Sequence, residues 1–113
     1  MPTPLSVAPK LTPSVDAQMR AWLTEAGAPE EYIEPMIAIG MCESRGSPEA
    51  IGDGGNSRGW LQLWTGWFPD AGYSLDQWTD PVVNAAVGVH VREVRGRFGG
   101  VGGWSCADHL GIP

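Results

Sequence analysis

Apolar side chains recur at helical spacing in three segments of the chain. The first segment places four of them on one face: Val15, Met19, Trp22 and Leu23. Thr12 is a favourable N-cap residue, and Pro13 suits the first position of a helix. We therefore expect a helix that begins at Thr12-Pro13 and ends at Gly27.

The second segment opens at Pro29-Glu30-Glu31, where acidic residues suit the positive end of the helix dipole. Residues 32–41 are apolar over most of a helical circumference, which is typical of a buried helix. Gly40 lets a neighbouring element approach closely. The run Gly46-Ser47-Pro48 is expected to end this helix.

The third segment begins at Asp80-Pro81 and is expected to form the longest helix, running to about Phe98. Five residues form its apolar stripe: Val83, Val87, Val91, Val94 and Phe98. Three cations fall in its last turns: Arg92, Arg95 and Arg97. Gly99-Gly100 is expected to terminate it.

The remaining segments are shorter and rich in turn residues. Residues 50–63 predict a small hairpin whose turn lies at Gly54-Gly55-Asn56. Residues 65–79 predict an irregular segment containing a short helix at 74–78, and a last helical turn follows Trp104. The pattern predicts a mainly α, α+β fold with a small β-hairpin lobe.

Length and charge restrict the classes of function. A chain of 113 residues fits one domain, which we place at residues 14–113, behind a Pro-rich arm at 1–13. The formal net charge of −6 and the lack of a basic patch argue against nucleic acid as a partner. No apolar run is long enough for a transmembrane helix, and no secretory signal is visible.

The most informative acidic residue is Glu43, which ends the apolar run of the second predicted helix. A carboxyl group among apolar surroundings has a raised pKa and can donate a proton near pH 7. A glycine-rich turn at residues 52–57 follows, and then an apolar-aromatic segment at 59–64 that carries one amide, Gln62. This succession suggests a groove for sugars.

Five motifs in this order resemble the lysozyme-like superfamily of soluble lytic transglycosylases and goose-type lysozymes. They are Glu43-Ser44, Ala50-Ile51-Gly52-Asp53, Gly59-Trp60-Leu61-Gln62-Leu63, Asp80-Pro81-Val82-Val83-Asn84-Ala85-Ala86-Val87-Gly88 and Gly103-Trp104-Ser105-Cys106. The resemblance covers roughly residues 30–106. It implies a small lysozyme-like fold with a substrate groove. It also implies cleavage of the β-1,4 bond between N-acetylmuramic acid and N-acetylglucosamine in peptidoglycan, with Glu43 as general acid.

Two reaction outcomes are open within this resemblance. Lytic transglycosylases use one carboxylate, and the C6 hydroxyl of the sugar closes a 1,6-anhydro product. Goose-type lysozymes use aspartates to position a hydrolytic water, and Asp53 matches one of these aspartates, unless it is simply a turn residue. Trp64 replaces the aspartate expected two residues after Gln62. Transglycosylation is therefore favoured over hydrolysis.

The same resemblance suggests further groove residues, each with a structural alternative. Ser44 either hydrogen-bonds near the acid or caps its helix. Gln62 alternates with Leu61 and Leu63, which would turn it toward the groove rather than toward solvent. Four aromatic residues are candidates for stacking on sugars or for the core: Trp60, Trp64, Tyr73 and Trp104.

The two cysteines, Cys42 and Cys106, are either a disulfide or two buried thiols. Their placement is similar to that in phage members of the superfamily, which favours the disulfide. Such a bond would stabilise the fold by roughly 3–4 kcal/mol. A zinc set that adds His90 and His109 has only half of a metal motif, so we expect no metal and no cofactor.

The expected setting is the bacterial cell wall, where a phage lysin would act after lysis or from the virion. Because the acidic charge does not attract the chain to an anionic wall, a virion or a separate wall-binding domain would localise it. Three other functions are open: a non-catalytic glycan-binding domain, a structural part of a phage tail, and a chitinase-like activity.

Overall fold

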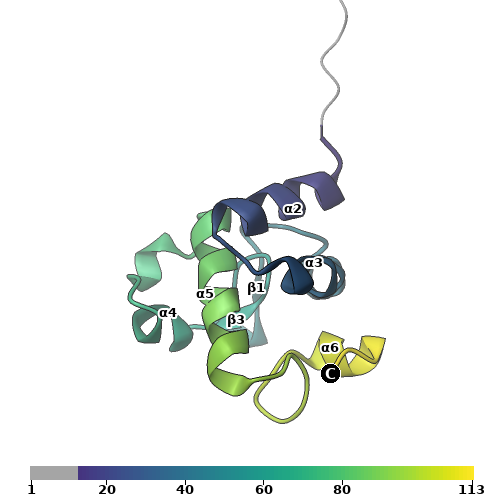
Figure 1. Ribbon diagram of the computed structural model, residues 1–113. Coiled ribbons are helices and arrows are strands. Elements are labelled where there is room, and N and C mark those ends of the chain that lie inside the picture. Colours follow the sequence, from purple (N-terminus) through teal and green to yellow (C-terminus); the bar gives the residue numbers. More distant parts are fainter. Residues whose placement is uncertain (1–12) are drawn as a thin grey trace, which may run out of the picture.

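The computed structural model describes residues 13–113 (Figure 1). Its helices are α2 (Val15–Glu25), α3 (Glu30–Ser44), α4 (Trp67–Asp70), α5 (Pro81–Arg95) and α6 (Ser105–Leu110). The strands are β1 (Ile51–Gly52), β2 (Ser57–Arg58) and β3 (Leu63–Trp64), and two 3₁₀ turns are η1 (Asp53–Gly55) and η2 (Leu75–Gln77). The predicted mainly helical α+β fold with a small antiparallel sheet is confirmed.

Helix α2 begins two residues later than the sequence predicts. Ser14 is its N-cap, because the Ser14 hydroxyl accepts a hydrogen bond from the backbone N–H of Ala17 at 3.1 Å. Pro13 therefore precedes the cap instead of occupying the first helical position. Thr12, the predicted cap, lies outside the described residues, as does the rest of the predicted arm at 1–12.

Helix α5 starts at Pro81 as predicted but ends at Arg95, three residues before Phe98. Gly96 adopts a left-handed conformation with φ 75°, and its N–H caps the carbonyl of Arg92. The predicted stripe therefore breaks: Val94 is 59% exposed, and Phe98 is buried only after the chain has left the helix. Helices α5 and α3 have the same length of 15 residues.

The β lobe has three short antiparallel strands instead of one hairpin. β1 pairs with β2 across the predicted glycine-rich turn, and β2 pairs with β3 with Ser57 opposite Trp64. The segment predicted as irregular contains α4, which the sequence pattern did not indicate. The short helix expected at 74–78 is the 3₁₀ turn η2, capped by the Ser74 side chain.

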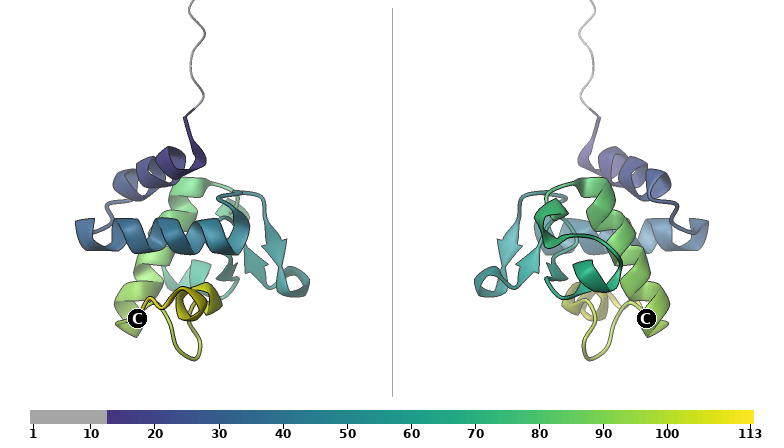
Figure 2. Two further views of the ribbon diagram at one scale, coloured as in Figure 1. Left: turned by 90° about the vertical axis from the view of Figure 1, so that its right-hand side faces the viewer. Right: turned by 90° about the vertical axis from the view of Figure 1, so that its left-hand side faces the viewer.

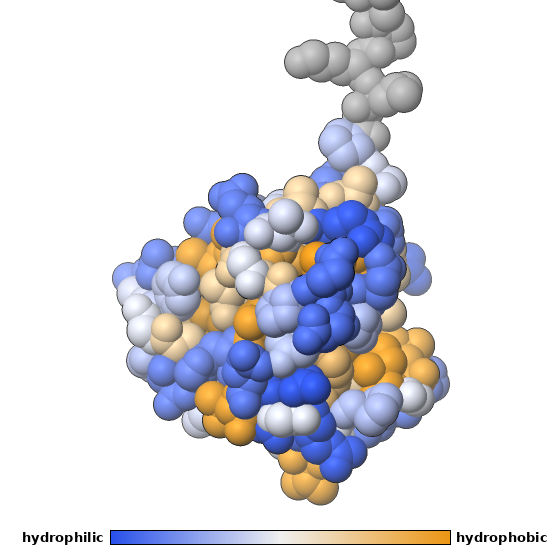
Figure 3. Space-filling model, in the orientation of Figure 1, coloured by the Kyte–Doolittle hydropathy of each residue, from blue (hydrophilic) through white to orange (hydrophobic). Residues whose placement is uncertain are grey.

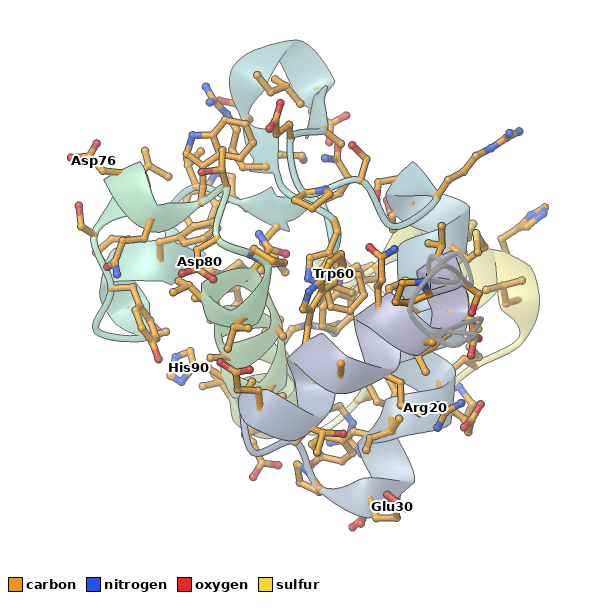
Figure 4. All side chains as sticks on the ribbon, turned by 90° about the horizontal axis from the view of Figure 1, so that it is seen from above. Arg20, Glu30, Trp60, Asp76, Asp80 and His90 are labelled. Atoms are coloured by element: carbon orange, nitrogen blue, oxygen red, sulfur yellow. A yellow bond between two sulfur atoms is a disulfide. The ribbon has the colours of Figure 1, made fainter. Side chains whose placement is uncertain are left out.

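Helices α2, α3 and α5 and the lobe supply most of the core, and α4 and α6 add Phe68 and Ala107. Helix α3 crosses α5, and the lobe lies beyond the C-terminal end of α3 (Figure 2). Trp60 is 0% exposed and lies in the middle of the molecule, whereas Asp76 and Arg20 lie at its periphery (Figure 4). The Trp60 ring packs against Gly40, where a Cβ would collide with it. Its Nε1 donates to the carbonyl of Pro81 at 2.9 Å, so Trp60 belongs to the core and not to a sugar site.

None of the described helices is long and apolar enough to cross a membrane. Hydrophilic side chains cover much of the face in Figure 3, and hydrophobic ones lie there in separate areas. The large apolar side chains that remain exposed come from different elements: Met41, Ile51, Trp64, Val94, Val101 and Leu110 among them.

Asn84 connects α5 to the chain between β2 and β3. It is fully buried. Its Oδ1 accepts from the Leu61 N–H at 3.0 Å, and its Nδ2 donates to the Arg58 carbonyl at 3.1 Å. Gly59 makes this contact sterically feasible, because a Cβ there would occupy the position of the Asn84 amide. The Asn84 amide thus joins two points of the lobe to α5.

Replacing Asn84 with Ala should lower the free energy of unfolding by about 2–4 kcal/mol, because it leaves a buried N–H and a buried carbonyl without partners. Urea denaturation measures this change. Val94→Thr, on an exposed position of the same helix, should change the free energy by less than about 0.5 kcal/mol. An Asn84→Ala protein as stable as the Val94→Thr control would show that these hydrogen bonds do not hold the lobe.

Candidate active site

A groove of about 280 Å³ lies between the lobe, the C-terminal end of α3 and the loop before α6. This volume is just below the usual range for ligand pockets, which begins at about 300 Å³. The side chains that matter for its chemistry are Glu43, Asp53, Gln62, Trp64, Trp67 and Trp104. The groove therefore combines two carboxyl groups with three indole rings.

Glu43 occupies the last turn of α3 and is half-buried at the groove. Burial raises the pKa of its carboxyl above the ordinary value, and the negative charge of Asp53 raises it further. The backbone N–H of Cys106 donates to Glu43 Oε2 at 3.3 Å and acts in the opposite direction. Because burial is the largest of the three effects, the net shift of the Glu43 pKa is upward, in the direction expected from the sequence.

The surroundings that bury Glu43 are not the ones that the sequence argument named. Met41, taken as part of an apolar environment, is 41% exposed, and Cys42 is exposed as well. The carboxyl instead lies beside the start of α6, and Trp104 lines the same groove. The C-terminal segment, distant in sequence, thus lies against the Glu43 carboxyl.

A disulfide joins Cys42 of α3 to Cys106 of α6, which confirms the favoured pairing. The bond closes a separation of 64 residues. Cys42 precedes Glu43 in the chain, and Cys106 supplies the N–H that Glu43 accepts. The disulfide thus connects the two elements whose contact partly buries the acid.

Asp53 lines the same groove, at the start of η1, with an exposed side chain and a left-handed backbone of φ 51°. Its Oδ2 accepts a hydrogen bond from the Ser57 hydroxyl at 2.6 Å. Aspartate tolerates this backbone region better than most residues. Asp53 is therefore both a turn residue and a groove residue, and the two interpretations offered by the sequence are compatible.

Gln62 lines the groove, but not for the reason the sequence suggested. It precedes β3 and has a left-handed φ of 50°, so strand alternation does not orient it. Its Nε2 donates to the carbonyls of Ala50 and Gly59 at 3.1 and 2.9 Å. Gln62 thus joins the backbone at Ala50 to the backbone at Gly59, and these hydrogen bonds hold the Gln62 side chain at the groove.

The tryptophans divide between groove and core. Trp64 is 59% exposed and lines the groove, together with Trp67 of α4, which the sequence pattern did not identify. Trp104 also lines it but is only 5% exposed, and its Nε1 donates to the Leu61 carbonyl at 2.8 Å. The prediction that Trp60 binds substrate is wrong, because this residue is enclosed in the core.

Ser44 and Tyr73, two further predicted binding residues, are not among the residues that line the groove. The Ser44 hydroxyl donates to the Trp60 carbonyl at 2.7 Å and accepts from the Ser47 N–H. It therefore caps the C-terminal end of α3 and fixes the backbone at Trp60. Tyr73 packs against the core. These side chains have structural partners that account for them.

Within residues 13–113, no three His, Cys, Asp or Glu side chains lie together in a way that could hold a metal ion. The disulfide also removes both cysteines from the zinc set considered for the sequence.

Comparison with models of protein families, with curated proteins and with solved structures finds no match to this chain.

Replacing both cysteines with Ser should lower the free energy of unfolding by about 4 kcal/mol, as expected for a loop of 64 residues. Guanidinium denaturation with and without reductant measures this change. Reductant should destabilise the native chain by a similar amount and leave the double variant unaffected. A loss below about 1 kcal/mol in both experiments would show that α6 stays in place without the bond.

Proposed function

We propose that this chain cleaves the β-1,4 bond between N-acetylmuramic acid and N-acetylglucosamine in bacterial peptidoglycan, as a lytic transglycosylase with Glu43 as general acid. The observation that carries the proposal is the half-buried carboxyl of Glu43 in a groove lined by indole rings. A protonated carboxyl at neutral pH is what the departure of a sugar oxygen requires.

The groove offers the two kinds of contact that a glycan chain uses. Trp64 and Trp67 present ring surfaces, and the apolar faces of sugar rings pack well on such rings. Asn56 supplies an amide along the same groove for hydroxyl and acetamido groups, whereas the Nε2 of Gln62 is already bound to Ala50 and Gly59 and leaves only its Oε1 as an acceptor. The described part of the groove carries no cation, so recognition of a neutral sugar backbone fits it better than recognition of a phosphate.

In the proposed reaction, Glu43 gives its proton to the glycosidic oxygen as that bond breaks. The carbonyl oxygen of the substrate's own N-acetyl group stabilises the positive charge at the anomeric carbon. Glu43, now a carboxylate, takes the proton of the C6 hydroxyl, whose oxygen bonds to the anomeric carbon. The product is a 1,6-anhydro sugar, and Glu43 is protonated again for the next turnover.

Hydrolysis is the second candidate, because Asp53 lines the same groove and its hydrogen bond with Ser57 restrains its carboxylate. In that reaction Asp53 would position a water molecule for attack at the anomeric carbon. Transglycosylation is preferred because Asp53 is exposed and Trp64 stands where the resembling hydrolases carry another aspartate.

Glu43→Gln should lower the rate of cell-wall clearing by about 10²–10⁴-fold, the usual contribution of a general acid. The assay follows the turbidity of purified peptidoglycan, with circular dichroism as the check on folding. The comparison variant is Trp64→Gln, which alters the sugar-binding surface and leaves both carboxyl groups in place. Equal clearing by Glu43→Gln and native protein would remove Glu43 from the reaction and leave a glycan-binding domain.

The product mass separates the two reactions, because an anhydro sugar lacks one molecule of water. Muropeptides released by native protein should have the anhydro mass. Asp53→Asn should then keep most of the rate, whereas a hydrolase would lose most of it. Products that carry the added water would replace transglycosylation with hydrolysis.

A further inference from the structure

A glycine-rich loop, residues 96–104, joins α5 to α6 (Figure 1). Four of residues 99–103 are glycines: Gly99, Gly100, Gly102 and Gly103. Gly102, Gly103 and Trp104 line the groove, so this loop forms one of its walls. Glycine loses more conformational freedom on folding than any other residue, so specific contacts are needed to fix a wall of this composition.

The guanidinium of Arg95, the last residue of α5, binds four carbonyl groups of this loop. Its Nη1 donates to the carbonyls of Arg97 and Phe98 at 2.9 and 3.0 Å. Its Nη2 donates to the carbonyls of Gly99 and Val101 at 2.6 and 3.3 Å. The ion pairs found within residues 13–113 do not include Arg95, so backbone carbonyls surround its charge in place of a carboxylate. The loop therefore curves round one cation.

The other hydrogen bonds of the loop use mainly its N–H groups. Those of Phe98 and Gly99 donate to the carbonyl of Pro113, and that of Gly100 donates to Asp108. Within residues 13–113, the carbonyls at positions 97, 99 and 101 are bound by Arg95 alone. Arg95 thus supplies contacts that the rest of the described chain does not replace.

The Arg95 guanidinium supports the part of the loop that faces the groove. A Cβ at Gly103 would collide with Arg95 Nη1 and with the carbonyl oxygen of Phe98. The Trp104 N–H donates to that same Phe98 carbonyl at 3.0 Å. Gly103 and Trp104 line the groove and Arg95 does not, so Arg95 holds this wall without presenting its charge to a substrate.

The same wall leads directly to the group that contacts the acid. Trp104 is the N-cap residue of α6, and its indole N–H is fixed on the carbonyl of Leu61 at 2.8 Å. Two residues later, the N–H of Cys106 donates to Glu43 Oε2 at 3.3 Å. The position of that N–H therefore depends on the path of the loop as well as on the disulfide.

We propose that Arg95 is a positioning residue of the groove, which fixes the glycine-rich loop so that Gly103, Trp104 and the Cys106 N–H keep their places beside Glu43. The loop is then a fixed wall and not a lid that closes on a substrate. A lysine would not serve equally well, because its ammonium is a point charge without the planar fork of donors. The relevance of this wall to catalysis rests on the proposed function, whereas the fixed loop does not.

Relaxation of ¹⁵N nuclei in the native protein tests whether the loop is fixed. Backbone order parameters at residues 97–103 should match those of α5, at about 0.85, the value typical of rigid backbone. Values below about 0.6, typical of flexible backbone, would overturn the proposal. This measurement decides the question even if a variant of Arg95 does not fold.

Arg95→Gln should accelerate amide hydrogen exchange at Gly103 and Trp104 at least about tenfold, because the loop opens more often without its central donor. The same variant should lower the pKa of Glu43 toward its ordinary value, since a displaced start of α6 leaves the carboxyl better hydrated. Arg95→Lys should resemble Arg95→Gln in both measurements. Arg97→Gln removes the same charge from an exposed side chain of the same loop and should behave like native protein.

A purely structural arginine would lower the free energy of unfolding in urea and leave the Glu43 pKa unchanged. That result would overturn the proposal. Native exchange rates and a native Glu43 pKa in Arg95→Lys would overturn it as well, because a positive charge alone would then suffice.

The NMR measurements do not use catalysis, so they stand apart from the proposed function. If native protein clears peptidoglycan, Arg95→Gln should slow clearing at least about tenfold, as expected when a reacting group is misplaced. A native protein that clears nothing would remove the proposed function, and the order parameters, exchange rates and Glu43 pKa would still decide the role of Arg95.

Discussion

The arrangement of this molecule depends on one constraint: the carboxyl of Glu43 is kept partly away from water by the start of α6. The adjacent Met41 and Cys42 of α3 are exposed. The C-terminal segment must dock, and the disulfide to Cys106 holds it there. Burial raises the pKa of the acid, so the folded chain keeps this proton at pH values where the unfolded chain loses it. The contribution of this group to the free energy of unfolding therefore falls as pH rises through that range. This loss of stability accompanies any acid whose pKa is raised by folding.

The segment between β2 and β3 joins the groove to the core through hydrogen bonds at Trp60 and Leu61. Ser44 donates to the carbonyl of Trp60, and the indole N–H of Trp104 donates to the carbonyl of Leu61. Asn84 accepts the N–H of Leu61. Three helices or helix-flanking segments therefore converge on two consecutive residues. Hydrogen bonds from three separate parts of the chain make this buried segment rigid, which helps to hold the groove residues Glu43 and Asp53 in place.

Much of the fold follows from local signals in the sequence. The apolar run of α3 and the Asp80-Pro81 start of α5 indicated both helices, and the glycine-rich turn indicated the β1–β2 pair. Local signals failed where tertiary contacts decide. Gly96 ends α5 although the apolar period continues to Phe98, because the glycine takes a left-handed conformation that periodicity does not reveal.

The candidate site was predictable to a similar degree. Glu43, Asp53, Gln62 and Trp104 meet in one groove, as the order of motifs suggested. Trp60 went to the core because Gly40 leaves room for its ring, a match between two distant residues that composition does not show. Trp67 was missed because α4 is a single short helix without a period of its own.

The pKa of the Glu43 side chain, measured by ¹³C NMR of the carboxyl carbon across a pH titration, tests the central claim most directly. Glu43→Gln identifies the resonance by its disappearance. The account predicts a value above the ordinary 4.5, because burial outweighs the hydrogen bond from Cys106. A value at or below 4.5 would mean that the carboxyl is well hydrated, and an acid ready to donate near neutral pH would then be contradicted.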